Sequence, residues 1–199
     1  MNESPKPRIL LALCLCLGLA VAGCSRAGDE PPLEGAQLGG PFTLTNQDGR
    51  KVSQADYAGR YRIVYFGFTH CPDVCPTDLM VIGQAMRRLE AKDKALAAQV
   101  QPIFITVDPE RDTAAVMKEY VAAFHPRLTG LTGTPDQIAA VAKAHGIYYS
   151  KTEVQPGGAY GMDHSRLVML FGRKGEPIAL LPFDKGAEAV AGELERWVK

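Results

Sequence analysis

The chain has 199 residues, and its 22 basic and 22 acidic side chains leave a formal net charge of zero at pH 7. A hydrophobic fraction of 46% and a charged fraction of 22% are those of a globular protein, which excludes a disordered chain, a collagen-like repeat and a multi-span membrane protein. The balanced charge argues against nucleic-acid binding, because neutralising phosphates takes an excess of basic residues. One domain of this length buries roughly 70% of its unfolded surface without disulfide staples. The five cysteines are therefore expected to do something besides stapling the fold.

The first residues have the pattern of a secretory signal. Lys6 and Arg8 precede an apolar run over residues 9–22, which is shorter than the roughly 20 residues that span a bilayer. The run ends in Val-Ala-Gly-Cys at residues 21–24. This ending resembles the bacterial lipoprotein signal, which implies cleavage before Cys24 and a thioether lipid on its sulfur. The other two cysteines of this segment would leave with the signal.

Three segments follow from this interpretation. Residues 1–23 are the predicted lipoprotein signal peptide, residues 24–40 a lipidated flexible tether rich in glycine and proline, and residues 41–199 the folded domain. An uncleaved amphiphilic anchor is the alternative for the first segment. In both cases we expect the domain to lie outside the cytoplasm at a membrane surface.

The rest of the sequence alternates β-forming runs with helical patterns, which predicts an α/β fold. We expect strands and hairpins over residues 42–52, 61–68, 103–107 and 167–181, and helices over residues 71–99, 113–124, 135–145 and 187–199. A strand–helix–strand unit followed by a hairpin and a closing helix is the thioredoxin layout, a central mixed β-sheet flanked by helices. An N-terminal hairpin and an inserted helical segment are added to it here. Asp112 or Thr113 is the expected cap of the inserted helix, and Gly146 the expected end of the next.

A pair of cysteines lies where the strand over 61–68 gives way to the long helix. Cys71 and Cys75 are four residues apart, so on a helix they share one face, about 6 Å apart along the axis. That spacing suits a disulfide or two sulfurs that bind one metal ion. The positive end of the helix dipole favours thiolates over thiols.

Three chemistries compete for the pair. A structural disulfide across so short a loop constrains little of the unfolded chain and would stabilise it weakly. Structural zinc takes four ligands, whereas the domain offers two thiols and four histidines. Soft thiolates with few partners favour Cu(I), and two thiolates then need a third, neutral donor.

The four histidines differ as candidates for that donor. His70 adjoins the first cysteine and points away from the cysteine face, so we interpret it as a tuning group. His125 and His145 stand at predicted helix ends, where a cation meets the helix C-terminus. His164 follows a glycine-rich approach, over residues 155–163, to a buried strand. In a thioredoxin layout the loop before that strand faces the redox helix, which leaves His164 an open candidate.

Three sequence blocks resemble the Sco/SenC family. They are Phe-Gly-Phe-Thr-His-Cys-Pro-Asp-Val-Cys-Pro at residues 66–76, Val-Asp-Pro-Glu-Arg-Asp-Thr at residues 107–113, and Asp-His-Ser at residues 163–165. The resemblance extends over residues 36–199. It implies a membrane-tethered, thioredoxin-fold copper chaperone that binds one copper, as Cu(I) or Cu(II). The implied ligands are Cys71, Cys75 and His164.

The resemblance also implies partners and a location. The expected client is the binuclear copper centre (CuA) of cytochrome c oxidase subunit II or of a related protein, with another periplasmic copper chaperone and a thioredoxin-like reductant as further partners. The inferred client favours the periplasmic side of the inner membrane. Two features depart from the family pattern: Met162 replaces a β-branched residue before Asp-His, and the predicted anchor is a lipid.

Several polar residues are candidates for supporting roles. His70, Asp73, Asp163 and Asp108 are the predicted second-layer or docking residues, with Asp78 also predicted on the docking surface. Asp163 could equally be a solvated carboxylate without a role at the site. Asp108 could equally be a turn residue at the end of a strand.

Two enzyme hypotheses remain beside copper delivery, which itself needs no certain catalytic residue. In a thiol-disulfide reductase, Cys71 and Cys75 would form a redox-active disulfide and His164 would be spare. In a peroxiredoxin-like peroxidase, a Pro-x3-Thr-x2-Cys signature would precede a cysteine. That signature fails at both cysteines, because neither has the required proline and threonine before it.

Overall fold

The structure, a computed structural model, describes residues 30–199. The chain divides into two units, Met1–Glu30 and Pro31–Lys199, and every element named below belongs to the second. The predicted signal peptide and Cys24 lie outside the described residues. Within the part that the structure describes, no helix has the length and apolar content needed to cross a membrane.

A mixed sheet of seven strands forms the centre of the domain, in the order β2-β1-β5-β4-β3-β8-β9. Its strands are β1 (Thr43–Asn46), β2 (Lys51–Ser53), β3 (Tyr61–Gly67), β4 (Val100–Thr106), β5 (Thr129–Thr132), β8 (Val168–Phe171) and β9 (Pro177–Leu180). The three central strands β5, β4 and β3 are parallel, and the outer pairings are antiparallel. All seven residues of β3 and of β4 are buried, because helices or loops cover both faces of a parallel sheet.

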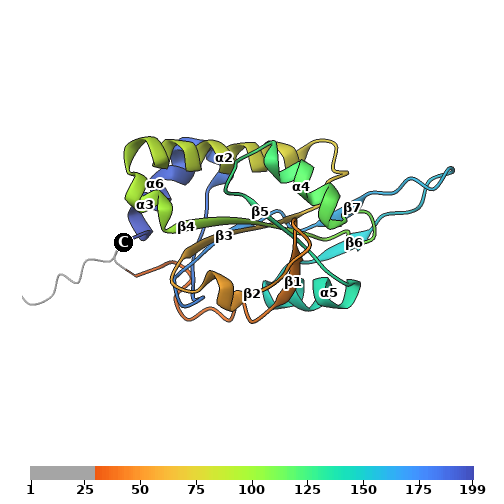
Figure 1. Cartoon of the computed structure of the whole chain (residues 1–199), viewed down its shortest axis with the longest axis horizontal. Coiled ribbons are helices and arrows are strands. Elements are labelled where there is room, and N and C mark those ends of the chain that lie inside the picture. Colours follow the sequence, from red (N-terminus) through yellow and green to blue (C-terminus); the bar gives the residue numbers. More distant parts are fainter. Residues whose placement is uncertain (1–29) are drawn as a thin grey trace, which may run out of the picture. The chain divides into compact units, whose positions relative to one another are not determined.

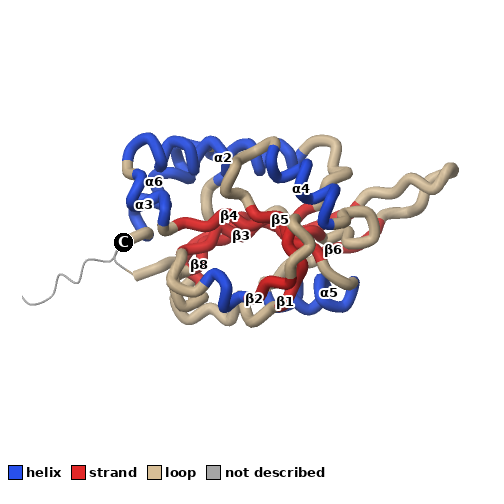
Figure 2. Tube along the Cα trace, viewed as in Figure 1, coloured by secondary structure: helices blue, strands red, loops and turns tan. Residues whose placement is uncertain are grey.

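Helices cover the two faces unequally (Figures 1 and 2). One face carries α2 (Val74–Lys92), α3 (Lys94–Ala98), α4 (Ala114–Ala122) and α6 (Ala187–Trp197), and the other carries α5 (Pro135–Ala144) and the short helix η1 (Gln54–Tyr57). A further short helix, η2 (Phe183–Lys185), precedes α6. The arrangement confirms the predicted α/β class with a central mixed sheet and flanking helices.

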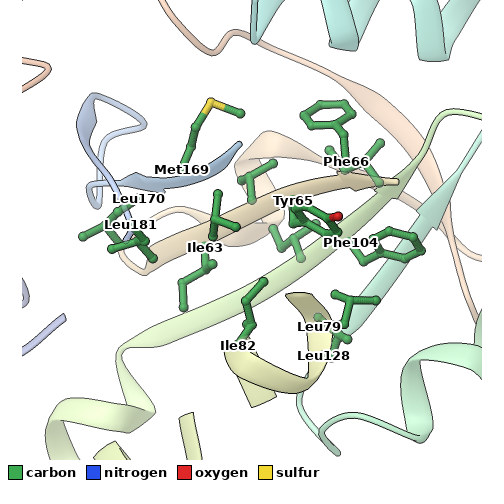
Figure 3. Packing of buried hydrophobic residues seen from close by; sticks show 14 of the residues in the cluster. Ile63, Tyr65, Phe66, Leu79, Ile82, Phe104, Leu128, Met169, Leu170 and Leu181 are labelled. Atoms are coloured by element: carbon green, nitrogen blue, oxygen red, sulfur yellow. The ribbon is translucent and has the colours of Figure 1, made fainter. Parts of the chain in front are cut away.

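The core explains why β3 is apolar throughout. Its alternate side chains point to opposite faces, so Ile63 and Tyr65 face Leu79 and Ile82 of α2, while Phe66 points the other way (Figure 3). Each of these side chains is at most 2% exposed. The start of α2 is therefore fixed against the most buried strand of the domain.

Helix ends agree with the sequence-based expectations. The Thr113 side chain accepts a hydrogen bond from the Val116 amide at 3.4 Å and caps α4. Gly146, with a φ of +66°, follows the last residues of α5. Such a positive φ costs glycine little.

Other boundaries differ from the predictions. The helix predicted over 71–99 begins at Val74 and breaks at Asp93, whose side chain accepts from the Leu96 amide and caps α3. The inserted helix is α4, and it connects β4 to β5, a strand that sequence patterns missed. Two more short strands, β6 (Tyr149–Lys151) and β7 (Met162–His164), pair as a separate antiparallel ribbon. Strands of three residues are too short to show a clear alternating pattern in the sequence.

The folded unit also begins earlier than residue 41. The Leu33 amide donates to the Ile178 carbonyl at 3.0 Å, and the Gly39 amide donates to the Ala144 carbonyl at 2.8 Å. The described part of the predicted tether therefore packs against the domain.

Candidate metal centre

The two cysteines occupy different kinds of backbone. Cys71 lies in the turn after β3, and Cys75 is the second residue of α2, so the prediction that both stand on the helix is wrong for Cys71. The two sulfurs are nevertheless brought near each other, because the Cys75 amide donates to Cys71 Sγ at 3.3 Å. Asp73, the residue before the helix, makes no capping bond with its side chain. The Cys71 sulfur thus satisfies one of the amides that the helix start leaves without a helical partner.

Both thiols are free and buried, with exposed fractions of 8% for Cys71 and 0% for Cys75. Gly67, the last residue of β3, makes room for the second sulfur. A Cβ atom at position 67 would lie 3.0 Å from Cys75 Sγ and 2.9 Å from the Phe104 ring. Sequence reasoning missed this residue, although a glycine that ends an apolar strand is a known sign of close approach.

Burial outweighs the helix dipole at Cys75. Loss of solvation raises the pKa of the Cys75 thiol to about 12, and the neighbouring Cys71 sulfur adds to the increase. The expectation that the helix start stabilises a thiolate is therefore wrong for this residue. At neutral pH Cys75 keeps its proton until a metal ion replaces it.

His164 completes the cluster from a distant part of the chain. It ends β7, where it pairs with Tyr149 across the ribbon, rather than lying in a loop. Its Nε2 atom is 3.4 Å from Cys75 Sγ, although 89 positions separate the two residues. The edges of Tyr65 and Phe68 pack around the imidazole, with interplanar angles of 74° and 88°.

The tautomer of His164 follows from its other nitrogen. Nδ1 is 3.1 Å from the carbonyl oxygen of Ser165. A carbonyl only accepts, so Nδ1 carries the proton and Nε2 keeps a lone pair toward Cys75. Asp163 is exposed and neighbours His164 in the strand, so its side chain points to the opposite face. The backbone of Ser165, rather than Asp163, orients the ring.

The donor set suits a soft metal ion. Two donors bound to one ion at about 2.0–2.3 Å lie roughly 3–4 Å apart, which matches the contact between Cys75 and His164 of 3.4 Å. Thiolate and imidazole ligands together suit copper and zinc, and a site of so few thiolates favours Cu(I). Among residues 30–199, no three His, Cys, Asp or Glu side chains already form a closed metal-binding cluster. Binding would therefore need a small closure of the three donors.

Asp78 is a buried residue of α2 behind the two cysteines. The prediction that it lies on a docking surface is wrong. Its side chain is 1% exposed. It accepts the Tyr65 hydroxyl at 2.9 Å and the Arg166 guanidinium at 2.7 and 2.5 Å. This bond to a carboxylate raises the pKa of Arg166 above its usual value.

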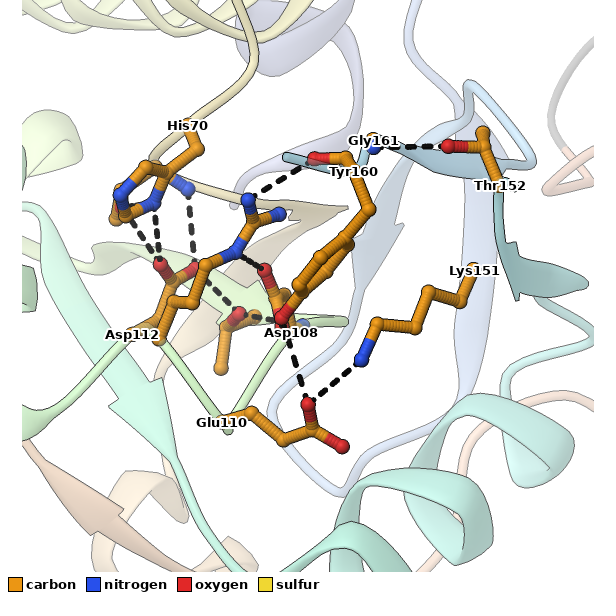
Figure 4. A network of polar contacts seen from close by, with 11 residues as sticks. His70, Asp108, Glu110, Asp112, Lys151, Thr152, Tyr160 and Gly161 are labelled. Carbon is orange, nitrogen blue, oxygen red and sulfur yellow. Dashed lines mark hydrogen bonds and ion pairs between the residues drawn. The ribbon is translucent and has the colours of Figure 1, made fainter. Parts of the chain in front are cut away.

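A second buried carboxylate fixes the turn that carries Cys71. Asp112, 0% exposed, accepts from the Thr69 amide at 3.0 Å, from the Thr69 hydroxyl at 2.5 Å and from the Thr106 hydroxyl at 2.6 Å. His70 faces this carboxylate, with Nδ1 3.6 Å from Asp112 Oδ1 (Figure 4). Sequence patterns predicted Asp112 only as a helix cap and missed this role.

A third group of contacts fastens the ribbon. Arg111 donates to the Asp108 carboxylate at 2.5 Å and to the Tyr160 carbonyl at 2.9 Å, and its guanidinium lies 3.6 Å from the centre of the Tyr160 ring. The Tyr160 hydroxyl donates to Asp108 at 3.0 Å, and Lys151 pairs with Glu110 at 2.8 Å (Figure 4). Asp108 is 3% exposed and accepts the Arg111 amide in the turn after β4. These contacts fit the turn interpretation and leave Asp108 little surface for docking.

The remaining candidates lie elsewhere. Asp73 is exposed beside the cysteine turn, and its docking role stays a prediction. His125 contacts Glu90, and His145 packs between Phe66 and Phe171 with Nδ1 2.8 Å from the Val141 carbonyl. Burial lowers the pKa of both histidines. These contacts are those of core histidines.

Comparisons with known proteins agree with the sequence blocks. The family model described as SCO1/SenC matches residues 30–199. "Protein SCO1 homolog 1, mitochondrial" of Arabidopsis thaliana is 44% identical over 147 residues, which are 73% of this chain and 43% of the relative. The chain thus spans about half the length of the curated relatives it matches.

Solved structures share the fold. The structure of Bradyrhizobium japonicum ScoI with copper bound is 41% identical, with a TM-score of 0.73 over 80% of this chain and 99% of that one. The thioredoxin domain of a Bacteroides vulgatus thiol-disulfide oxidoreductase, 15% identical, has a TM-score of 0.56 over 81% of this chain and 96% of that chain, which shows a common thioredoxin-like fold. The described domain, matched over its full length by the family model, makes this chain a member of the SCO1/SenC family.

Proposed function

We propose that this protein is a copper chaperone that carries one copper on Cys71, Cys75 and His164. The contact of 3.4 Å between Cys75 Sγ and His164 Nε2 carries the proposal, because the fold brings a neutral nitrogen donor to a buried pair of thiols. The similar Bradyrhizobium ScoI, solved with copper bound, supports copper as the cargo.

The three donors have complementary tasks. Two thiolates bind Cu(I) with a net site charge of −1 and Cu(II) with none, so both oxidation states are accessible. The Nε2 lone pair of His164 adds a donor without adding charge. Cys75 must release its proton as copper enters, since its thiol is protonated at neutral pH. Incoming thiolates of a client would remove the copper by ligand exchange.

The family suggests the client and the place of delivery. We infer that the recipient is the CuA centre of cytochrome c oxidase subunit II or of a related protein, reached from outside the cytoplasm by a lipid-anchored domain. Membrane partitioning of the mature protein tests the anchor. Cys24→Ser should block lipidation and the cleavage that follows it, and cleavage at the same bond in that variant would contradict a lipoprotein signal.

A copper titration of the soluble domain tests the ligands. His164→Ala should weaken copper binding and alter the thiolate charge-transfer absorption of the Cu(II) form. His125→Gln removes an imidazole from another buried site and should leave both unchanged. A wild-type spectrum in His164→Ala would remove His164 from the site.

Thiol-disulfide reduction of the client remains the second candidate, because it uses the same free cysteine pair. Only delivery needs His164, since thiol exchange proceeds through sulfur alone. A His164→Ala strain should lose CuA-dependent oxidase activity at low copper and recover part of it in excess copper by mass action. Normal oxidase activity at limiting copper would favour the reductase.

A further inference from the structure

We propose that Arg166, held by the buried carboxylate of Asp78, is a positioning residue that sets His164 against Cys75. The proposal rests on the function proposed above, because it explains how the third copper ligand is placed. Nothing in the sequence pattern singled out Arg166, and Asp78 was expected at the surface.

The pairing between Arg166 and Asp78 has a fixed geometry. Arg166 Nε donates to Asp78 Oδ2 at 2.7 Å, and a terminal nitrogen of the guanidinium donates to Oδ1 at 2.5 Å. Two parallel bonds between planar groups restrict orientation as well as distance. The Tyr65 hydroxyl, at 2.9 Å from Oδ2, holds the carboxylate from the strand beneath. The Asp78 side chain of α2 is thereby fixed against β3.

The Cys75–His164 contact and the Asp78–Arg166 pair both join the start of α2 to the end of the β6–β7 ribbon. Cys75 and Asp78 are three residues apart on α2, so they lie on one side of the helix about 5–6 Å apart. His164 and Arg166 are two residues apart at the end of the ribbon, and in extended chain such residues share a face about 7 Å apart. These similar spacings let one segment reach both Cys75 and Asp78 at once.

The second link is the stronger one before copper arrives. The contact of 3.4 Å between Cys75 and His164 joins one sulfur to one ring nitrogen, and sulfur is a weak hydrogen-bonding group. The contact at Asp78 is an ion pair with Arg166. Because the Asp78 side chain is 1% exposed, water cannot readily take the place of the guanidinium. Arg166 therefore determines where the chain passes α2, and His164 follows from it.

A purely structural role is the alternative, because Arg166 also lies 4.9 Å from the centre of the Phe183 ring. A double-mutant cycle separates the two. If Arg166 acts through His164, Arg166→Gln should weaken Cu(I) binding about tenfold, as outer-layer partners of ligands do. It should have no further effect in a His164→Ala background.

The measurements are Cu(I) dissociation constants by chelator competition and the nitrogen coupling in the electron paramagnetic resonance spectrum of the Cu(II) form. Arg166→Lys keeps the charge and loses the paired geometry, so its dissociation constant should lie between those of the wild type and Arg166→Gln. If Arg166→Gln does not fold, Arg166→Lys provides the test in its place. Lys92→Gln, which breaks the exposed pair between α2 and Glu195, should change neither quantity.

Each other outcome overturns the inference. An unchanged dissociation constant in Arg166→Gln and Arg166→Lys removes the positioning role while the ligand set stands. An equal loss of affinity with and without His164 assigns Arg166 a structural role. Unchanged copper binding in His164→Ala alone overturns the ligand set and this inference with it.

Discussion

The two parts of the site differ in how they are held. Cys71 and Cys75 belong to the core, with exposed fractions of 8% and 0%, between the most buried strand and its covering helix. His164 comes from the β6–β7 ribbon, which projects from one end of the sheet (Figure 1). Residues 153–159 at its tip are all exposed. Few buried apolar contacts stabilise such a segment, and it opens at low cost in free energy.

This difference suits the proposed function, in which copper is first held and later released. The two proposed ligands in the core, Cys71 and Cys75, are linked to each other directly, because the Cys75 amide donates to Cys71 Sγ. The third proposed ligand, His164, is held through the ion pair of Arg166 with Asp78 and through the contacts of Arg111 with Asp108 and Tyr160. The following changes alter one part or the other.

Loss of a core ligand should have the largest effect. Cys75→Ser fits the same space, because the oxygen is smaller than the sulfur beside Gly67, yet it removes a thiolate. Loss of outer-layer partners costs about 10–100-fold in metal affinity, so loss of the ligand should raise the Cu(I) dissociation constant by at least about 100-fold. Chelator competition measures it, and a change below tenfold would contradict the ligand assignment.

Filling the space beside Cys75 should disturb the core half alone. Gly67→Ala places a methyl group 3.0 Å from Cys75 Sγ and 2.9 Å from Phe104, and such overpacking costs about 1–3 kcal/mol. Gly192→Ala in α6 meets no atom within 4 Å and should stabilise by about 0.5–1 kcal/mol. Denaturant unfolding of the copper-free protein measures both, and equal effects would show that Gly67 is not tightly packed.

Releasing the ribbon should have a moderate effect. Arg111→Gln removes the charged bond to Asp108 and the stacking on Tyr160, so amides of β6 and β7 should exchange hydrogen faster and copper affinity should fall a few-fold. Lys151→Gln breaks the exposed pair with Glu110 and the contact of the ammonium group with the Tyr160 ring at 3.8 Å. Each is worth about 0–1 kcal/mol at an exposed site, so this variant should change exchange less than Arg111→Gln. Unchanged exchange in Arg111→Gln would show that the ribbon is held elsewhere.

Acid should destabilise the core through its buried histidines, with the smallest effect. Burial lowers the pKa of His145 below its ordinary value of 6.5, so below that pH the unfolded chain binds more protons than the folded protein. The free energy of unfolding is therefore fully retained above pH 6.5 and falls as the pH drops below it. His145→Leu should reduce this slope by up to about 1.4 kcal/mol per pH unit. An identical slope in urea unfolding between pH 5 and 7 would contradict the buried, uncharged state.

Local sequence signals were sufficient for the framework. The strand at 61–68, the caps at Thr113 and Gly146, and the hairpin at 167–181 follow from propensity and turn chemistry, which act between near neighbours. The predicted helix start failed at Cys71, because the turn that holds it is fixed by Asp112, 41 positions later. The expectation of a thiolate at Cys75 failed because a helix dipole is a local effect, whereas burial depends on the entire fold.

The sequence by itself determined the cysteine pair, the family resemblance and His164 as a candidate, since these depend on residue type and order. Only the tertiary structure decided that His164 Nε2 meets Cys75 Sγ at 3.4 Å, that Gly67 makes space for that sulfur, and that Asp78 is buried with Arg166. Contacts between residues almost 90 positions apart depend on how the sheet and helices pack, and the local pattern around each residue does not contain that information.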